Sequence, residues 1–566
     1  MTRSSLILNE TLNVIDDYRQ QIGGDDARLS IHDSLAAFDI TSIILDKVNT
    51  AISEHNQHVD KDKGEKGWAL ITDLPVYVVA EVMLGLYPIC NICYVNSKSD
   101  KTNSILSIYE DEGLKQGLYT SDEGVFLELA QQYRPEIADN AGFEKLMKIL
   151  HLKAEVKNPN HDADLAAANN GIVDIPNKKL LPFSHEYVFV AKSAGNYIED
   201  KSQLKCPVFA NPDGTTWNFD EWLDDLTDDA EVRPLFREII GATLRPNVSY
   251  NKTAFFYAET GNNGKGTFCE LIKALNPNFI ALPIDKFDDE FALTDAPYAN
   301  VIIGDDNDVG VMIQRSGNFK NTITNDSISV NRKHRDQVSA VIRAFMIQCF
   351  NQLPVFKDKT TALYRRIIII PFDKCFTGVE RGYIKTDYMH RQEVLDYALT
   401  IALDMDCRKL SEPKNCKMLL AEYTVINDPI KQFLEEMIDQ FTWDLVPYGF
   451  LYRLYVAWYK LNVPTGSVES KEKVINRIKN IVLAPANEYP EWTVTKKDAI
   501  RVAHRMDQPE LLIATYGLTD WQRQNYHGND LKTQCTPNLN TNTQKFRGLV
   551  RKSSITIDDE EKEGEE

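Results

Sequence analysis

Membrane-length apolar runs, a cysteine pattern typical of a disulfide framework, and an excess of positive charge are all missing from this sequence. No segment approaches the roughly 18 consecutive apolar residues that a membrane helix needs, and the N-terminal stretch MTRSSLILNETLNVIDDYRQ is amphipathic and unlike a signal peptide. The nine cysteines are scattered singly apart from Cys90 and Cys93, which argues against a disulfide framework. We therefore expect a soluble, cytoplasmic protein that does not contact membranes.

One zinc arrangement has to be considered. His55 and His58 form an H-x-x-H pair, and Cys90 and Cys93 form a C-x-x-C pair, which is the kind of spacing that structural zinc sites use. The cysteines, however, lie in LYPICNICYV, a run typical of a buried strand, and free cysteine is among the most buried residue types. Ordinary core thiols are therefore the favoured interpretation, and no zinc is expected.

The charge balance excludes a further class of protein. Lys and Arg number 63 against 83 Asp and Glu, which leaves a formal net charge of −20. A protein that coats nucleic acid with its whole surface is basic, so any contact with DNA must be local here. The segment DDEEKEGEE at residues 558–566 is typical of a solvated, disordered tail.

The chain is long enough for several domains. At about 100 to 200 residues per domain, 566 residues predict three or four units. Residues 1–65 are polar and helix-patterned, and residues 66–225 mix strand-like runs (WALITDL, VYVVAEVML, YVFVA) with helical ones. Residues 226–410 hold the apolar runs TAFFYA, NVIIG, AFMIQCF and RRIIIIPF, as expected for a buried parallel sheet in an α/β fold. Residues 420–515 carry three amphipathic helices and fit a winged-helix-like domain, and residues 516–566 are predicted to be a polar and acidic disordered tail.

The segment FFYAETGNNGKGTF, residues 255–268, has the composition of a phosphate-binding loop. Its apolar strand leads into a turn where Gly261 and Gly264 permit dihedrals that a Cβ would block. A helix from Thr267 to about Leu275 then points its N–H groups and dipole at the same spot, and Lys265 adds a mobile charge. The predicted nucleotide-binding residues are Gly261, Asn262, Asn263, Gly264, Lys265, Gly266 and Thr267.

This loop departs from the usual pattern G-x-x-x-x-G-K-[ST] at two places. Glu259 stands where the first glycine belongs, and Gly266 stands where the hydroxyl ligand of Mg²⁺ belongs, with Thr267 one residue later. The Gly-Lys-Gly-Thr ending resembles the variant of adenylate kinases and many phage helicases. The alternative is a strand-to-helix turn rich in Gly and Asn, with an incidental lysine.

Polar residues lie next to the apolar strands that follow. Asp305 and Asp306 come directly after NVIIG, at the strand end where ligands bind in open α/β sheets. We assign Asp305 to Mg²⁺ through water and Asp306 to polarising the attacking water. Asn351 directly follows AFMIQCF and can sense a γ-phosphate. Arg365 and Arg366 directly precede IIIIPF. An arginine that lies far from its own phosphate loop can reach a neighbour's nucleotide, which makes catalysis depend on a ring of subunits.

A basic turn lies between the acids and the Asn. In FKNTITNDSISVNRKHRDQ the alternation of Ile328 and Val330 predicts a β-hairpin. Its tip would carry Arg332, Lys333, His334 and Arg335. Such a tip places cations on a DNA backbone without making the acidic surface sticky, and the alternative is a solvated basic loop.

The ordered motifs GNNGKGTF, NVIIGDDN, FKNTITNDSISVNRKH, IQCFNQLP and YRRIIIIPF resemble those of the superfamily 3 helicases, in particular the phage and plasmid primase-helicase family related to the poxvirus primase-helicase. AANNGIVDIPNKKLLPFS upstream, and DPIKQFLEEM and LYRLYVAWYKL downstream, are similar to the flanking regions of that family. The resemblance covers about residues 70–510. It implies a central AAA+ P-loop ATPase in a homo-hexameric ring that translocates on single-stranded DNA, usually 3′ to 5′, with ATP and Mg²⁺ at subunit interfaces.

The resemblance also implies roles for single residues. It assigns Lys265 and Thr267 to Walker A, Asp305 and Asp306 to Walker B, Lys320 to the DNA-binding motif before the hairpin, Lys333 and His334 to the DNA-gripping tip, Asn351 to sensor 1, and Arg365 or Arg366 to the arginine finger. Mg²⁺ is expected at Asp305, with Thr267 as a second candidate. Gly266 departs from the family pattern, as does Asp306, where a Glu is frequent. About 65 polar residues before the shared region are too few for the primase that many relatives carry, so no primase activity is expected.

The favoured function is an ATP-dependent replicative DNA helicase of a phage, plasmid or phage-satellite element in a bacterial cytoplasm. Its expected partners are single-stranded and forked DNA, origin duplex DNA through the C-terminal domain, and a separate primase or other replisome proteins. One alternative is an origin-binding initiator with weak ATPase activity, in which the nucleotide serves assembly. A small-molecule kinase is the other, and it leaves the hairpin and the residues from Asn351 to Arg366 unexplained.

Overall fold

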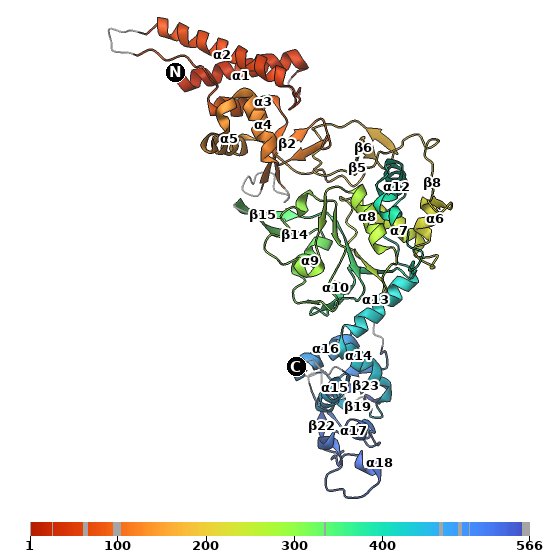
Figure 1. Ribbon diagram of the computed structural model, residues 1–566. Helices are drawn as coiled ribbons and strands as arrows, with labels where there is room; N and C mark the ends of the chain where they lie inside the picture. Colours follow the sequence, from red (N-terminus) through yellow and green to blue (C-terminus); the bar gives the residue numbers. More distant parts are fainter. Residues whose placement is uncertain are drawn as a thin grey trace. The chain divides into compact units, whose positions relative to one another are not determined.

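Figure 1 shows the computed structural model of the chain, which describes residues 2–24, 27–59, 66–93, 104–332, 335–462, 468–484, 489–496 and 498–556. The chain divides into two compact units, Met1–Leu420 and Ala421–Glu566. The point of division falls within helix α13 (Lys414–Ile426). In the described part of the chain, no helix is both long and apolar enough to span a membrane.

Helices dominate the first 160 residues, as the polar, helix-patterned sequence predicts for residues 1–65. They are α1 (Arg3–Ile22), α2 (Ser34–Gln57), α3 (Val76–Leu86), α4 (Glu123–Tyr133) and α5 (Asn140–Lys153). Apolar residues recur every fourth position in α2, and each of them is fully buried: Ile40, Ile44, Val48 and Ile52. This stripe faces the core that the five helices share.

Two of the predicted strands in this region are wrong. VYVVAEVML lies inside α3, whose apolar residues are buried on several sides, so the run lacks the periodicity that separates a helix from a strand. WALITDL forms no strand, because its backbone hydrogen-bonds to side chains of α2 and not to another strand. The backbone N–H of Trp68 donates to Asn56 Oδ1 at 2.7 Å, and that of Ile71 donates to Asn49 Oδ1 at 2.9 Å.

The same region contains a small sheet, in the order β3-β2-β1-β4, whose first three strands lie between α3 and α4 in the chain. Its strands are β1 (Ile89–Cys93), β2 (Ser104–Glu110), β3 (Leu118–Thr120) and β4 (Val156–Lys157). The predicted buried strand around the two cysteines is therefore confirmed as β1. The third predicted strand, YVFVA at residues 187–191, is wrong: it forms no strand, and its Phe189 carbonyl accepts one hydrogen bond from the Tyr119 N–H.

Short hairpins connect this region to the central sheet. The segment AANNGIVDIPNKKLLPFS contributes to the antiparallel strands β5 (Leu165–Ala168), β6 (Gly171–Asp174) and β7 (Lys179–Leu181). The pair β8 (Val208–Ala210) and β9 (Thr216–Asn218) then leads into α6 (Phe219–Asp224) and α7 (Arg233–Thr243).

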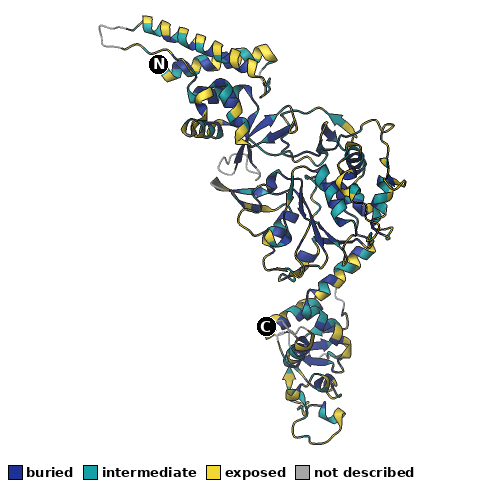
Figure 2. Ribbon diagram, viewed as in Figure 1, coloured by how far each residue is buried: buried dark blue, intermediate teal, exposed yellow. Residues whose placement is uncertain are grey.

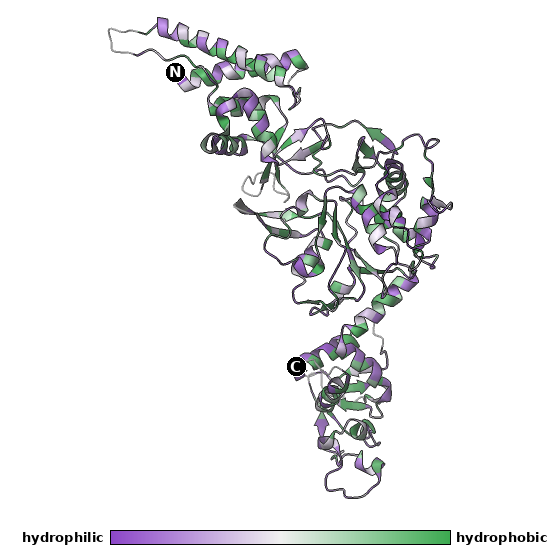
Figure 3. Cartoon of the chain, in the orientation of Figure 1, coloured by the Kyte–Doolittle hydropathy of each residue, from purple (hydrophilic) through white to green (hydrophobic). Residues whose placement is uncertain are grey.

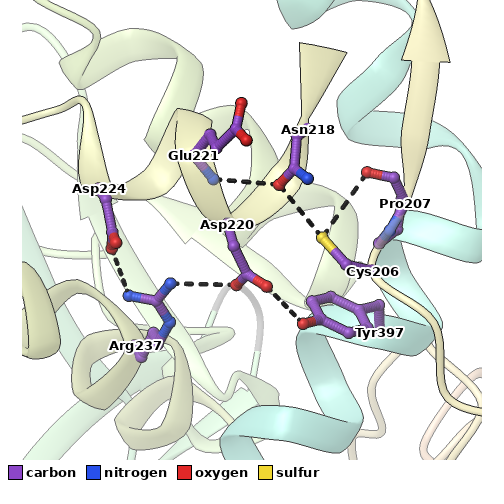
Figure 4. A network of polar contacts seen from close by, with 8 residues as sticks. All are labelled: Cys206, Pro207, Asn218, Asp220, Glu221, Asp224, Arg237 and Tyr397. Atoms are coloured by element: carbon purple, nitrogen blue, oxygen red, sulfur yellow. Dashed lines mark hydrogen bonds and ion pairs between the residues drawn. The ribbon is translucent and has the colours of Figure 1, made fainter. Parts of the chain in front are cut away.

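The network in Figure 4 ties α6 to its surroundings. Arg237 of α7 pairs with Asp220 at 3.0 Å and with Asp224 at 2.6 Å. The Tyr397 hydroxyl donates to the other oxygen of Asp220 at 2.6 Å, and it comes from α12 (Gln392–Asp404). Two segments more than 150 residues apart in the chain are thereby joined at one aspartate.

A five-stranded parallel sheet forms the centre of the first unit. Its strands are β10 (Thr253–Tyr257), β11 (Phe279–Ala281), β12 (Val301–Gly304), β16 (Phe345–Phe350) and β18 (Ile367–Pro371), in the order β11-β12-β16-β10-β18. All residues of β12, β16 and β18 are buried, and the strands are dark blue in Figure 2 and largely in the hydrophobic colour in Figure 3. The four predicted strands are confirmed, and β11 is additional.

Helices and small pairs of strands surround this sheet. They are α8 (Lys265–Leu275), α9 (Gly317–Ile323), α10 (Thr361–Tyr364), α11 (Gly382–Thr386), the parallel pair β13 (Met312–Ile313) and β17 (Val355–Phe356), and the antiparallel pair β14 (Ser327–Arg332) and β15 (Arg335–Val341). Helices α7, α8 and α12 share one apolar core with the sheet.

The second unit combines helices with a three-stranded antiparallel sheet. Its helices are α14 (Pro429–Met437), α15 (Tyr448–Asn462), α16 (Lys471–Val482), α17 (Leu512–Thr515) and α18 (Leu531–Gln534). Its strands are β19 (Leu445–Pro447), β20 (Trp492–Val494), β21 (Ile500–Arg501), β22 (Lys545–Phe546) and β23 (Gly548–Arg551). Trp443, Trp458 and Trp492 are fully buried in its core.

The predicted disordered tail at residues 516–566 needs correction. Strand β23 lies within it and is the central strand of the sheet, between β19 and β20. Leu549 and Val550 are buried and pair with residues more than 100 positions earlier in the chain. The second unit therefore extends past residue 515 to at least residue 551, and the acidic residues 558–566 lie outside the described part.

Candidate functional site

The predicted phosphate loop joins β10 to α8. The helix begins at Lys265, two residues before the predicted start, and Gly264 precedes it as the N-cap with φ +89°. A Cβ at Gly264 would also lie 2.7 Å from a methyl carbon of Leu226. Glycine is therefore required at this position for both its backbone conformation and its close packing.

Lys265 joins the loop to the next strand. It is only 8% exposed, and its amine donates to Asn351 Oδ1 at 2.9 Å and to the Ala258 carbonyl at 3.4 Å. Burial lowers the pKa of Lys265. Asn351 follows β16, which is parallel to β10, so the predicted lysine and the predicted amide meet at one edge of the sheet.

Asp305 and Asp306 lie at the same edge, directly after β12. Lys273 of α8 pairs with Asp305 Oδ2 at 2.5 Å, whereas Asp306 is exposed. The next residue, Asn307, is buried and makes four hydrogen bonds. It accepts from the Ile284 N–H and donates to the Gly304 carbonyl, the Gln348 side chain and the Cys349 carbonyl. The loop that carries both acids is therefore fixed to β16.

The residues at this edge fit the triphosphate of ATP together with Mg²⁺. The left-handed Gly264 precedes the first turn of α8, whose N–H groups face the loop as at any helix N-terminus, and the amine of Lys265 lies at the same edge beside Asn351. A carboxylate, Asp305, follows β12, two strands away from β10, and offers the oxygen ligand that Mg²⁺ prefers. Thr267, the second candidate, lies in the first turn of α8.

Two thiols lie beside Asp305. The sulfur atoms of Cys269 and Cys349 are 3.4 Å apart, and the possible ligand atoms of these two residues and Asp305 all lie within 4.8 Å of one another. The contact with Cys349 and burial raise the pKa of Cys269, which keeps it a neutral thiol. We interpret the pair as a packing contact that joins α8 to β16.

The sequence motif with two histidines and two cysteines does not form such a cluster among the described residues. Cys90 and Cys93 lie three positions apart on β1, and side chains at odd spacing point to opposite faces of a strand. Burial raises the pKa of Cys90 to about 12. His55 stacks on Trp68 with the ring centroids 3.6 Å apart.

Arg365 and Arg366 lie at the opposite edge of the sheet. Strand β18 is parallel to β10 and pairs Ile367 with Thr253, so both arginines lie where β10 begins. The guanidinium of Arg366 is half-buried and donates to the Ala362 carbonyl, whereas Arg365 is exposed. The predicted site residues are therefore divided between two edges, with the arginines away from their own phosphate loop.

The predicted hairpin is present as β14 and β15, with Val330 opposite Val338. Its tip residues Lys333 and His334 lie outside the described part, as do the side chains of Arg332 and Arg335. Lys320 of α9 pairs with Asp358 at 2.7 Å. Burial alone would raise the pKa of Asp358, but hydrogen bonds from Lys320, Thr360 and Ser316 hold it at about 2.

The sequence did not point to Lys273, which pairs with the predicted Asp305, or to Asn307, which fixes the loop that carries both acids. Lys273 lies eight residues after Lys265 on one helix, a spacing that places the two side chains near the same face of the helix. Nor did the sequence point to the segment after β18, where the Phe376 N–H donates to the Asn262 carbonyl at 2.7 Å. No local sequence pattern predicts this contact.

Two family models match parts of the chain. Residues 256–366 match a family of unknown function, DUF5906, and residues 426–523 match the family described as poxvirus D5 protein-like. No curated protein matches the chain. The resemblance drawn from the motifs thus has a matching family model in the C-terminal unit.

Solved structures of the NrS-1 C-terminal region are similar to the chain at low identity. The apo A form has 12% identity and a TM-score of 0.41, and the match covers 84% of this chain and 100% of that one. A second apo structure of that region has 10% identity and a TM-score of 0.38, with coverage of 76% and 96%.

Proposed function

We propose that this chain is an ATP-driven DNA helicase of a replication system, in which neighbouring subunits share each ATP site. The observation that carries the proposal is the convergence at one sheet edge. Lys265 bonds to Asn351, and Lys273 of the same helix bonds to Asp305. The strand before the amide, β16, lies next to the strand that enters the loop, β10, and the strand before the acids, β12, lies on the other side of β16. This arrangement suits a polyphosphate with its metal and its attacking water.

In this proposal the residues have distinct tasks. The N-terminus of α8 and the amine of Lys265 bind the phosphates, and Lys265 exchanges its contact with Asn351 for them. Asp305 and Thr267 are the candidate ligands of Mg²⁺, which supplies charge neutralisation at the phosphates when it is bound. Asp306 is exposed at the same edge and orients the attacking water. Asn351, freed from the lysine, senses the γ-phosphate.

The opposite edge of the sheet supports a shared site. Arg365 is exposed there and can reach the nucleotide of a neighbour in a ring of subunits, which we take to be a hexamer. The hairpin β14–β15 would bring its basic tip to the DNA backbone. Single-stranded DNA at a fork is the proposed track, with 3′ to 5′ movement. The three helices and antiparallel sheet of the second unit suit a winged-helix-like domain that binds origin duplex DNA.

The match of residues 426–523 to the poxvirus D5 protein-like family supports a role in replication. We place the chain in a phage, plasmid or phage-satellite element, where a separate primase would complete the replisome.

DNA-stimulated hydrolysis of ATP tests the proposal. Lys265→Ala should lower hydrolysis at least about a hundredfold, because a preorganised cation at the phosphates is lost. It should also abolish the unwinding of a forked duplex, while Lys265→Arg keeps the charge and serves as the comparison. A wild-type chain that neither binds nor hydrolyses ATP would refute the proposal.

An origin-binding initiator is the second candidate. Two observations favour it. Lys273 forms an ion pair with Asp305, the candidate ligand of Mg²⁺. Asp306 has a shorter side chain than the Glu that is frequent at this position of the family motif. In that case ATP would drive assembly on origin DNA while turnover stays slow, with no unwinding of a fork. Measuring assembly and turnover in the same samples separates the two functions, and transfer of phosphate to a nucleoside monophosphate would indicate the kinase instead.

A further inference from the structure

Gly266 stands where phosphate loops usually carry a hydroxyl residue, and its backbone does not explain why. It is the second residue of α8, and its φ lies outside the left-handed region. Glycine in a helix is less favourable than alanine. One neighbour lies close to this position: a Cβ there would lie 3.3 Å from the amine nitrogen of Lys385, so the amine would have to move by a few tenths of an ångström.

Lys385 belongs to α11, which packs on α8. The segment that leads to it is tied to the phosphate loop. The Phe376 N–H donates to the Asn262 carbonyl at 2.7 Å, and the Asn262 amide donates to Glu380 Oε1 at 3.0 Å. The amine of Lys385 is therefore brought to Gly266 by a segment that contacts the same loop.

This amine has no partner among the described residues, since Lys385 forms no hydrogen bond or ion pair with them. Other cations of the region are engaged. Lys273 pairs with Asp305 at 2.5 Å, Lys374 with Asp228 at 2.5 Å, and Arg391 with Asp387 at 2.6 Å. In a chain of net charge −20, an unengaged amine against a phosphate loop is positioned for an anion.

The distance has a simple chemical meaning. In the usual motif the hydroxyl at this position binds Mg²⁺, with a metal–oxygen distance of about 2.0 to 2.1 Å. A metal bound in that way would lie roughly 3 Å from the Cβ, because one carbon–oxygen bond separates the two. The amine of Lys385 thus lies about as far from Gly266 as that cation would.

We propose that Lys385 is a second phosphate-binding cation, and that glycine occupies position 266 to admit its amine. The inference rests on the proposed function, in that it takes the ligand to be a nucleoside triphosphate. An ammonium beside the phosphates replaces part of the neutralisation that the hydroxyl and its metal give elsewhere. ATP binding by this chain therefore depends weakly on Mg²⁺, although hydrolysis still uses Asp305.

Binding of a fluorescent ATP analogue to the full chain, with Mg²⁺ and with EDTA, tests the inference. Lys385→Met should weaken binding about tenfold in EDTA and less in Mg²⁺, as expected for the loss of one charge-assisted contact. Lys374→Met is the matched control: its amine belongs to the same segment but pairs with Asp228, so binding should not change. Thermal melting in each case checks that the variants are folded.

The glycine gives a second, coupled measurement. Gly266→Ala should displace the amine and weaken binding in EDTA, but it should have no further effect in Lys385→Met protein, where the amine is gone. Gly266→Ser combined with Lys385→Met should restore binding only when Mg²⁺ is present.

The outcomes separate two failures. Wild-type protein that binds no ATP would refute the proposed function itself. Wild-type binding with Lys385→Met unchanged in EDTA would overturn only the role of Lys385, and additive losses in the double variant would overturn the link between Gly266 and that amine.

Discussion

Lys265→Ala and Arg365→Ala protein, each inactive alone, should regain ATP hydrolysis when they are combined in one ring. The reason is the parallel sheet, which places Lys265 after the end of β10 and Arg365 beside its beginning. The five residues of β10 alone span about 16 Å at roughly 3.3 Å per residue, which is more than one side chain covers. The arginine can therefore serve only the site of a neighbour.

The size of the rescue follows from counting interfaces. A working site needs an intact Lys265 from one subunit and an intact Arg365 from the next. In a closed ring filled at random from equal amounts, about one interface in four meets this condition, whatever the ring size. We expect about a quarter of wild-type turnover at equal amounts, falling symmetrically as either variant is in excess.

The assay uses co-expressed variants with two different affinity tags. Purification on both tags ensures that every sample contains mixed assemblies before DNA-stimulated ATPase activity is measured. Arg366→Ala is the comparison, because its guanidinium already donates to the Ala362 carbonyl, and we expect no such rescue pattern from it. Verified mixed assemblies that hydrolyse no ATP at any ratio would refute the shared site.

Four further predictions concern single positions. Gly264→Ala should lower the free energy of unfolding by about 1 to 2 kcal/mol in denaturant titrations, because φ is +89° there, whereas Gly261→Ala, with no atom within 4 Å of the added Cβ, should not. Asp358 has a pKa of about 2 in the folded chain against 3.8 when unperturbed, so its contribution is complete above pH 4 and is lost as the pH falls toward 2. After allowance for partial exposure this amounts to about 1 to 2 kcal/mol, and in Asp358→Asn protein the corresponding pH dependence of unfolding should disappear. Gly548→Ala should destabilise the second unit by about 1 to 3 kcal/mol, because a Cβ there collides with the Val446 carbonyl, and removal of residues 516–566 should unfold that unit, as circular dichroism would show. Asp306→Glu should raise ATP turnover if the shorter carboxylate slows hydrolysis, and unchanged turnover would remove that explanation.

The sequence predicted those parts of the fold that local patterns determine. Four strands of the central sheet are short apolar runs of four to six residues that are bounded by polar residues. Buried parallel strands have that signature. The phosphate loop, the acids and the amide could be located because each directly follows such a strand. Their meeting at one edge then follows from parallel pairing alone.

The failures have physical causes. Helix α3 is apolar on several sides, so its sequence carries no period that would distinguish it from a strand. WALITDL has strand composition, but the backbone groups of Trp68 and Ile71 bond to asparagine side chains of α2. Strand β23 has only two apolar side chains, Leu549 and Val550, and is stabilised by pairing with β19 and β20. Local composition cannot reveal such pairing.

The two departures from the family motif differ in what the structure says about them. A Cβ at Gly266 would lie 3.3 Å from the amine of Lys385, 119 positions later, and under the role proposed for that amine the departure is a change of partner and not the loss of a function. Asp306 has no such partner in the described residues, but the loop that carries it is fixed by the four hydrogen bonds of Asn307. Because that backbone cannot shift to make up for a missing methylene, the position of the carboxylate is set by side-chain length alone. Under the proposed function, the distinction between a helicase and a slow, assembling initiator depends on this carboxylate and on the pairing of Lys273 with Asp305.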